Sequence, residues 1–300
     1  MDAIAERDAR EGRGAGALGA VWRVPPQLLF VTGALTQYAG AGLAVLLFDR
    51  VPVLGVAWLR VLTAAVVLCA WAKPWRLPAG AHWSWERVRL IAGFGIALSA
   101  MNACFYLAID RLPLGTTVAL EFVGPIAVTA LGSRTRRDLL ALLVAGGGVV
   151  LLADAQISGS ALGVALGLGA GGLWAVYIVL GHRIAADSAF SARRGLAAAM
   201  AIGALALAPF AAPGSASALL SPLAVAACVG VGLASSVIPY ALDQVAMARL
   251  PRARFALLLA LLPATATLAG LAVLGQVPTV AEAFGIALVV GATALGSHAD

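Results

Sequence analysis

The stretch Leu112–Val128, LPLGTTVALEFVGPIAV, is an apolar segment that carries one carboxylate, Glu121, near its middle. Pro125 follows four residues later. In a helix a proline has no N–H to offer the carbonyl four residues back, which here is that of Glu121 itself. The segment therefore combines a charge, a kink and an unpaired acceptor within an expected membrane span. Such features are costly in lipid and typically mark a cavity or a pathway.

The composition of the whole chain indicates the same environment. Its 300 residues are 62% hydrophobic and only 11% charged, with a mean hydropathy of +0.97, whereas a soluble domain has about 25% charged residues. Apolar runs long enough to cross a bilayer as helices recur along its length. They are continuous rather than alternating, which disfavours strands. We expect an all-α polytopic membrane protein with ten transmembrane helices, near 27–47, 55–72, 90–109, 115–132, 139–153, 160–180, 195–212, 222–247, 253–274 and 281–297.

The basic residues predict the orientation of these spans. With the N-terminus in the cytoplasm, 17 of the 20 Lys and Arg residues fall in segments that face the cytoplasm. The outer loops hold only Arg50 and Arg111, and Arg60 lies within the second span. The positive-inside rule then places both termini inside. This distribution argues against a nucleic-acid partner for the net charge of +6, and residues 1–26, which mix acids, arginines and glycines, are expected to form a flexible cytoplasmic tail.

Two blocks of the sequence resemble each other, which indicates a duplication. The run from Gly93 to Ser99 resembles that from Gly230 to Ser236, and Arg111-Leu112-Pro113 matches Arg249-Leu250-Pro251. Twelve residues after each of these prolines comes another, Pro125 and Pro263, and one inserted residue reconciles the two blocks. The unit is therefore five spans, and a unit with an odd number of spans inserts upside down the second time. We expect two inverted repeats, at 27–153 and 160–297, an arrangement typical of secondary transporters.

Polar and aromatic side chains inside the spans are candidates for one substrate cavity. Asn102 and Tyr106 share a helix face, as do Trp174 with Tyr177 and, just after Pro239, Tyr240 with Asp243. The candidate substrate-binding residues are Glu121, Asn102, Tyr106, Trp174, Tyr177, Tyr240 and Asp243, and the candidate helix breaks are Pro125, Pro239 and Pro263. The alternative for the aromatic residues is a position at the lipid interface, and for Asp243 contact with water or arginine at a cytoplasmic end. Arg60 is either a partner for Glu121 or snorkels to an interface.

The remaining motifs do not indicate a cofactor site, a metal site or a catalytic site. Gly167–Gly172 fits G-x-G-x-x-G but follows no strand, so its glycines are expected to permit close helix packing. Cys69, Cys104 and Cys228 lie in separate spans, and the three histidines lie in loops or the tail. We therefore expect no metal, no cofactor and no enzymatic activity.

The motifs carry a resemblance to a known family. Lys73-Pro-Trp-Arg-Leu77, Phe105-Tyr106-Leu107, Val118-Ala-Leu-Glu-Phe122 with Gly124-Pro125, Trp174-Ala-Val-Tyr177 and Pro239-Tyr240 are similar to segments of EamA-type drug/metabolite transporters. Within that superfamily the chain most resembles bacterial inner-membrane exporters of threonine and homoserine. The resemblance implies export of small amino acids or related metabolites across the inner membrane, driven by protons. Leu262 and Gln276 stand where those exporters tend to carry acids, so the substrate follows less directly than the fold.

A mechanism follows as a hypothesis. Ionised Glu121 holds the ammonium group of a zwitterionic amino acid, and a helix N-terminus or broken helix receives the carboxylate. A proton from outside neutralises Glu121 and releases the substrate, while the halves rock about Pro125 and Pro263. The alternatives are the same fold with another metabolite, amine or toxic compound as cargo, a lipid flippase or lipid-modifying enzyme, and a membrane protein without transport activity.

Overall fold

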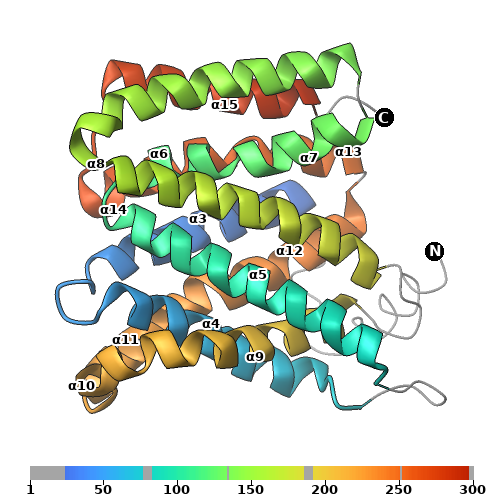
Figure 1. The fold of residues 1–300 in the computed structure, drawn as a ribbon, viewed down its shortest axis with the longest axis vertical. Coiled ribbons are helices and arrows are strands. Elements are labelled where there is room, and N and C mark those ends of the chain that lie inside the picture. The colour runs from blue at the N-terminus through green and yellow to red at the C-terminus, as the bar shows by residue number, and fades with distance from the viewer. Residues whose placement is uncertain (1–23, 77–82, 134, 186–191, 251, 297–300) are drawn as a thin grey trace.

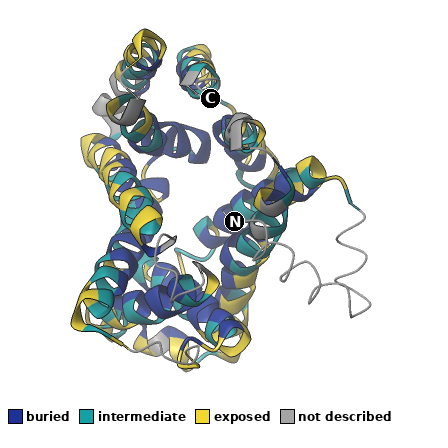
Figure 2. Ribbon diagram, turned by 90° about the vertical axis from the view of Figure 1, so that its right-hand side faces the viewer, coloured by how far each residue is buried: buried dark blue, intermediate teal, exposed yellow. Residues whose placement is uncertain are grey.

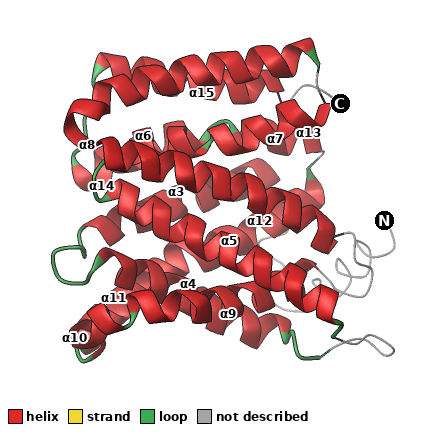
Figure 3. Cartoon of the chain, viewed as in Figure 1, coloured by secondary structure: helices red, strands yellow, loops and turns green. Residues whose placement is uncertain are grey.

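The computed structural model describes residues 24–76, 83–133, 135–185, 192–250 and 252–296. Every regular element in these ranges is helical (Figure 3). The expected tail lies outside the described residues as far as residue 23. In chain order the helices are α3 (Pro26–Val45), α4 (Val53–Ala72), α5 (Trp85–Ile109), α6 (Leu114–Glu121), α7 (Val123–Ser133), α8 (Arg136–Ala185), α9 (Ala192–Ala211), η2 (Pro213–Ser215), α10 (Ala216–Leu219), α11 (Pro222–Gly232), η3 (Leu233–Val237), α12 (Ile238–Arg249), α13 (Arg252–Leu259), α14 (Leu262–Leu274) and α15 (Val280–Gly296).

Seven helical segments of the described residues are long and apolar enough to cross a membrane: Pro26–Val45, Val53–Ala72, Trp85–Ile109, Leu114–Leu131, Ser160–Ile184, Arg193–Ala211 and Pro222–Met247. Leu262–Leu274 and Val280–Leu295 are apolar but shorter. These helices confirm an all-helical protein with several membrane spans.

The surface of the bundle suits a lipid environment. Large apolar side chains such as Val66, Leu143, Leu205 and Phe284 are exposed, and the exposed parts of the helices lie mainly on the outside of the ring in Figure 2. In water such an apolar surface would favour aggregation. In a bilayer it is the expected one, because lipid tails are as apolar as these side chains.

Helix α8 joins two expected spans into one element. Its backbone leaves the helical region at Ser160 (φ −159°, ψ 81°), and Figure 1 shows the helix folding back there into two arms. The first arm packs against α15, where a Cβ on Gly148 would lie 2.9 Å from the Gly285 carbonyl oxygen. The second arm packs against α5, where Gly93 lies beside Leu180.

The third span begins earlier than the hydropathy predicts. Helix α5 starts at Trp85 rather than near residue 90, because the Ser84 hydroxyl accepts a hydrogen bond from the Arg87 amide (3.3 Å). This is an N-cap, which satisfies a backbone donor that the first turn leaves free. The extra turn carries charged residues, so it extends the helix beyond the apolar part of the span.

Two long segments are interrupted after equal lengths. Helices α6 and α13 each contain eight residues, and each begins directly after an Arg-Leu-Pro sequence. Glu121 ends α6 and α7 resumes at Val123, while α13 ends at Leu259 and α14 resumes at Leu262. Figure 1 shows α6 and α7 end to end across the upper part of the bundle, with α14 beside α6.

A third interruption divides the segment before α13. Helices α11 and α12 are joined by η3, a π-helical turn over Leu233–Val237. A π turn holds one more residue than an α turn and is usually a local bulge within an α-helix. Pro239 occupies the second residue of α12, directly after this turn.

Candidate functional site

Glu121 is the last residue of α6 and points into the protein. Its side chain is 8% exposed, and no described residue donates a hydrogen bond to its carboxylate or forms an ion pair with it. Buried carboxylates are normally paired, since a charge removed from water is expensive unless it is compensated. An acid in this position has its hydrogen-bonding capacity available for a ligand.

The backbone of α8 closes one side of the break at Glu121. A Cβ on Gly171 would lie 2.6 Å from the Glu121 carbonyl oxygen, so only glycine fits there without displacement. Gly124 of α7 faces the Gly171 carbonyl in the same close approach, and Gly167 packs against Leu120. Of the three glycines that define the G-x-G-x-x-G sequence, only Gly167 packs against a neighbouring helix, whereas Gly169 and Gly172 meet nothing within 4 Å. The expected close helix packing therefore depends on Gly167 and on Gly171.

A set of charged and aromatic side chains surrounds Glu121. Tyr38 of α3 is buried and lies within electrostatic range of three charged side chains, those of Glu121, Asp243 and Arg60. Tyr240 of α12 interacts with the same three. Two acids and one base from three helices therefore share one neighbourhood around two tyrosines.

Asp243 is half-buried, on the side of α12 that packs against α3. Its Oδ1 atom would lie 3.6 Å from a Cβ on Gly33 of α3. No described residue forms an ion pair with it. The acid therefore faces α3, and its part in a substrate site stays a prediction.

Arg60 of α4 neither snorkels to an interface nor forms an ion pair with Glu121. It is 6% exposed and reaches the π turn, where Nε donates to the Ser236 hydroxyl (2.8 Å) and Nη2 to the Ser235 carbonyl (2.8 Å). That carbonyl lies four residues before Pro239, whose missing N–H leaves it without its helical donor. The guanidinium thus satisfies an acceptor that the proline frees.

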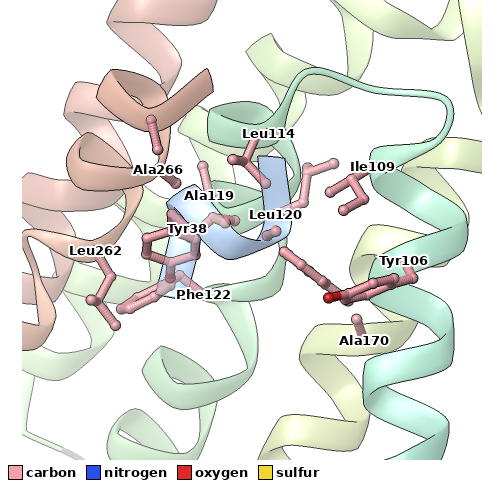
Figure 4. Close-up of a cluster of buried hydrophobic side chains, with 14 of the residues drawn as sticks. Tyr38, Tyr106, Ile109, Leu114, Ala119, Leu120, Phe122, Ala170, Leu262 and Ala266 are labelled. Atoms are coloured by element: carbon pink, nitrogen blue, oxygen red, sulfur yellow. The ribbon is translucent and has the colours of Figure 1, made fainter. Parts of the chain in front are cut away.

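Tyr106 and Asn102 of α5 are both buried but differ in their contacts. The guanidinium carbon of Arg60 lies 5.2 Å from the centre of the Tyr106 ring, within cation–π distance, and the Tyr106 hydroxyl has no hydrogen-bond partner among the described residues. Figure 4 shows this ring projecting from α5 toward α6. The Asn102 amide instead donates to the Leu98 carbonyl of its own helix (2.8 Å).

The two aromatic candidates on α8 pack against other rings. Trp174 meets Phe122, directly after Glu121, edge to face, with ring centres 5.0 Å apart. Tyr177 stacks on Phe94 of α5 at 4.6 Å and interacts electrostatically with Tyr240 and Asp243. Trp174 therefore lies beside the break at Glu121, and Tyr177 connects to the α12 side of the neighbourhood.

Side chains from the end of the chain hold the beginning of α6. The Gln276 side-chain oxygen accepts a hydrogen bond from the Leu114 amide (3.0 Å), and Thr116 donates to Glu282 of α15 (3.3 Å). Glu282 also accepts from the Thr279 amide, while its own amide donates to the Thr279 hydroxyl, forming a capping box for α15. The helix that presents Glu121 is therefore fixed at its start by α15 and the connection before it.

Sequence reasoning missed Tyr38 and left the partner of Arg60 open. Tyr38 gave a weak signal, since it follows Gln37 as the second residue of a polar pair in an otherwise apolar span. For the π turn there was a second weak signal, since the extra residue of the second block falls between Ser236 and Arg249 and the turn ends at Val237. Among the described residues no group of three or more His, Cys, Asp and Glu side chains is arranged to hold a metal ion.

Comparison with known proteins defines the family. A family model described as the EamA-like transporter family matches residues 161–297. The chain is 35% identical over 276 residues to the threonine/homoserine exporter RhtA of Escherichia coli (strain K12), covering 91% of this chain and 90% of that protein. It is 34% identical over 275 residues to the RhtA protein of Salmonella typhimurium (strain LT2), covering 89% and 90%. A solved structure described as a crystal structure of protein shares the fold, with a TM-score of 0.58 at 20% identity, covering 90% of this chain and 95% of the other.

The apolar helices indicate a multi-pass membrane protein, and the family match and the exporter relatives place it in the transporter class. The chain belongs to the EamA-like transporter family. The resemblance drawn from its motifs is therefore confirmed.

Proposed function

We propose that this protein is a secondary active transporter that exports small amino acids of the threonine and homoserine type across the bacterial inner membrane by proton antiport. The observation that carries the proposal is the buried Glu121 carboxylate, which has no ion-pair or hydrogen-bond partner among the described residues. The relatives named as threonine/homoserine exporters supply the substrate class. The ammonium group of an amino acid is the complement that such a carboxylate lacks.

We propose further that the chain consists of two inverted five-helix repeats, residues 27–153 and 160–297, making ten spans in all. The equal lengths of α6 and α13 after matching Arg-Leu-Pro sequences support this arrangement. Capping boxes support it as well, since Thr135 pairs with Asp138 before the first arm of α8 as Thr279 pairs with Glu282 before α15. The π turn supports it too, because such a turn holds one residue more than an α turn and ends at Val237, where the interval with the extra residue begins.

Both termini are proposed to be cytoplasmic. Figure 1 shows the start of α5, the end of α7 and the end of α12 at one end of the bundle, with α10 and the bend of α8 at the other. The basic residues at the helix ends there are Lys73, Arg76, Arg87, Arg89, Arg136, Arg137, Arg249 and Arg254. Positive residues gather on the cytoplasmic side of membrane proteins.

The proposed transport cycle uses Glu121 twice. From the cytoplasm the ionised carboxylate binds the substrate ammonium, with Tyr106, Trp174, Tyr177, Tyr240, Asn102 and Asp243 shaping the site. A proton arriving from outside neutralises Glu121, removes the Coulombic attraction and releases the substrate. The backbone breaks before Pro125 and Pro263 allow the two halves to rock, so that the site opens to each side in turn.

The same fold with another cargo is the alternative function. Leu262 and Gln276 replace acids that resembling exporters tend to carry, and both side chains lie on the segment that packs beside α6. Another metabolite, an amine or a toxic compound would use the same unpaired carboxylate. A cationic amine in particular has no carboxylate group, so it would need only the ammonium site at Glu121.

The test is uptake of labelled threonine and homoserine into inside-out vesicles with an imposed pH gradient. The wild type is compared with Glu121→Gln, which keeps the shape and removes the charge. Asp110→Asn is the matched control, because Asp110 is exposed and pairs with Arg111 at the surface. We expect Glu121→Gln to lose gradient-driven uptake by at least about 100-fold, as for the loss of an essential charged partner, and Asp110→Asn to retain it.

Two results would contradict the proposal. Uptake by Glu121→Gln that still follows the pH gradient would remove Glu121 from the coupling step. Absence of uptake in vesicles that contain folded wild-type protein would reject the proposed substrates. A panel of amines and other metabolites would then identify the cargo.

A further inference from the structure

Arg60 has more hydrogen-bond donors than the protein uses. A guanidinium carries five N–H groups, and the described residues accept from Nε and from Nη2 only. Nη1 has no partner among the described residues, although the side chain is almost fully buried. The two bonds to the π turn fix the plane of the guanidinium and leave one edge of it unoccupied.

The hydroxyl of Tyr106, whose ring centre lies 5.2 Å from this guanidinium, also lacks a partner. Its residue is fully buried, and no described residue accepts or donates a hydrogen bond there. A buried hydroxyl without a hydrogen bond is expensive, so its retention next to an arginine requires an explanation. One acceptor placed against both groups would satisfy the hydroxyl and the free guanidinium edge together.

The charges around this place are complementary to a zwitterion. Arg60 acts electrostatically on Glu121, yet no ion pair joins them within the described residues. The cation and the anion are thus close without neutralising each other. An α-amino acid carries its ammonium and carboxylate groups on one carbon, so it can meet both charges at once.

Other candidates for a carboxylate-binding group are already occupied. The N-terminus of α6 is capped by Gln276, and Gly115 in its first turn faces Thr267 of α14. Arg111 is at the surface and pairs with Asp110. Among the basic residues of the described spans, Arg60 is the one that combines burial with free donors near Glu121.

We propose that Arg60, held by the π turn, and the Tyr106 hydroxyl bind the carboxylate group of the transported amino acid, opposite the ammonium site at Glu121. This inference rests on the proposed function and replaces the helix N-terminus as the receiver of the carboxylate. It makes Arg60 a specificity residue, because this contact distinguishes an amino acid from the amine that lacks its carboxyl group. An arginine fork suits this role, because its geometry matches a carboxylate.

The test measures binding by isothermal titration calorimetry with the full chain in detergent. The ligands are L-homoserine and 3-aminopropan-1-ol, which is homoserine without its carboxyl group. We expect the wild type to bind homoserine roughly 10- to 100-fold more tightly, the range for hydrogen bonds to charged groups. Arg60→Gln should bind homoserine only as tightly as the amino alcohol, and its affinity for the amino alcohol should stay within about threefold of wild type.

Two further variants keep the test valid if Arg60→Gln does not fold. Arg60→Lys retains the charge but loses the fork, so its preference for homoserine should fall to roughly 3- to 10-fold. Tyr106→Phe removes only the hydroxyl and should weaken homoserine by about 3- to 10-fold while leaving the amino alcohol unchanged. A purely structural role for Arg60 or Tyr106 would weaken both ligands equally.

The outcomes separate this inference from the proposed function. Equal binding of homoserine and 3-aminopropan-1-ol by the wild type would overturn the inference and leave an exporter that recognises the ammonium group. Variants that lose both ligands in parallel would also overturn it. Failure of folded wild-type protein to bind either ligand would reject the proposed substrates, and the carboxylate site with them.

Discussion

The α6–α7 break and the π turn η3 both follow from a proline, but the protein stabilises the two breaks in different ways. In each, a proline leaves the carbonyl four residues earlier without its helical donor, that of Glu121 before Pro125 and that of Ser235 before Pro239. At Ser235 a charged side chain from another helix takes the place of the missing amide. At Glu121 the backbone of α8 closes over the carbonyl at a glycine.

The difference teaches that a broken helix in a membrane can be secured by charge or by close packing. A guanidinium bond tolerates changes of size nearby but depends on one side chain. Close backbone packing depends on no functional group but tolerates no added atom. The two breaks should therefore respond to different mutations.

The largest expected effect is at Gly171. Gly171→Ala places a methyl group 2.6 Å from the Glu121 carbonyl oxygen, whereas Gly172→Ala meets nothing within 4 Å. The first variant should lose roughly 3 kcal/mol of stability relative to the second, since both gain similarly from replacing a helical glycine. This is the upper end of the about 1–3 kcal/mol that overpacking costs, because the clash is with a backbone atom. Thermal unfolding in detergent measures the difference; equal stabilities would show that the α6–α7 break does not depend on close packing.

The next largest effect concerns the hydrogen bond from Arg60 to the Ser235 carbonyl. Arg60→Met leaves the Ser235 carbonyl without its donor and should cost about 1–3 kcal/mol. Pro239→Ala restores an N–H four residues after that carbonyl, so it should recover part of this loss in the Arg60→Met background. A double-mutant cycle of unfolding free energies should give a coupling of at least about 0.5 kcal/mol. Strict additivity of the two changes would mean that Arg60 does not replace the missing amide.

The smallest effect lies at the other end of α6. Gln276→Glu keeps an oxygen acceptor for the Leu114 amide and adds a negative charge at a helix N-terminus. It should stabilise the protein by about 0.3–1 kcal/mol, because anions interact favourably with the positive end of the helix dipole. Gln276→Leu, which removes the acceptor at similar size, should destabilise it in the same thermal assay. If the two variants have the same stability, the Gln276 cap contributes nothing to α6.

Much of the fold could be predicted from hydropathy because each span is locally encoded. The expected span at 27–47 corresponds to α3, and that at 195–212 to α9. The early start of α5 escaped the prediction because it depends on the Ser84 cap, which lies among charged residues. The joining of two expected spans within α8 depends on the backbone at Ser160, which hydropathy does not report.

The site was predictable only where its signal is local. Glu121 and Pro125 stand four residues apart, so the break could be inferred from one segment. The Ser235 carbonyl lies 175 residues beyond Arg60, and no pattern in the sequence joins them. Asn102 shows the opposite case. Its position on the same helix face as Tyr106 predicts a site residue, but its side-chain amide donates to the Leu98 carbonyl of its own helix.

The π turn has a consequence for the history of the gene. Each residue of an α-helix advances the chain by about 100° around the axis, so an inserted residue would rotate everything that follows. A π turn absorbs the addition within a few residues and leaves the remainder of the helix in register. On the proposed duplication, gain of one codon in the second copy would have formed this turn, and with it the contact to Arg60, without rotating the part of α12 that follows.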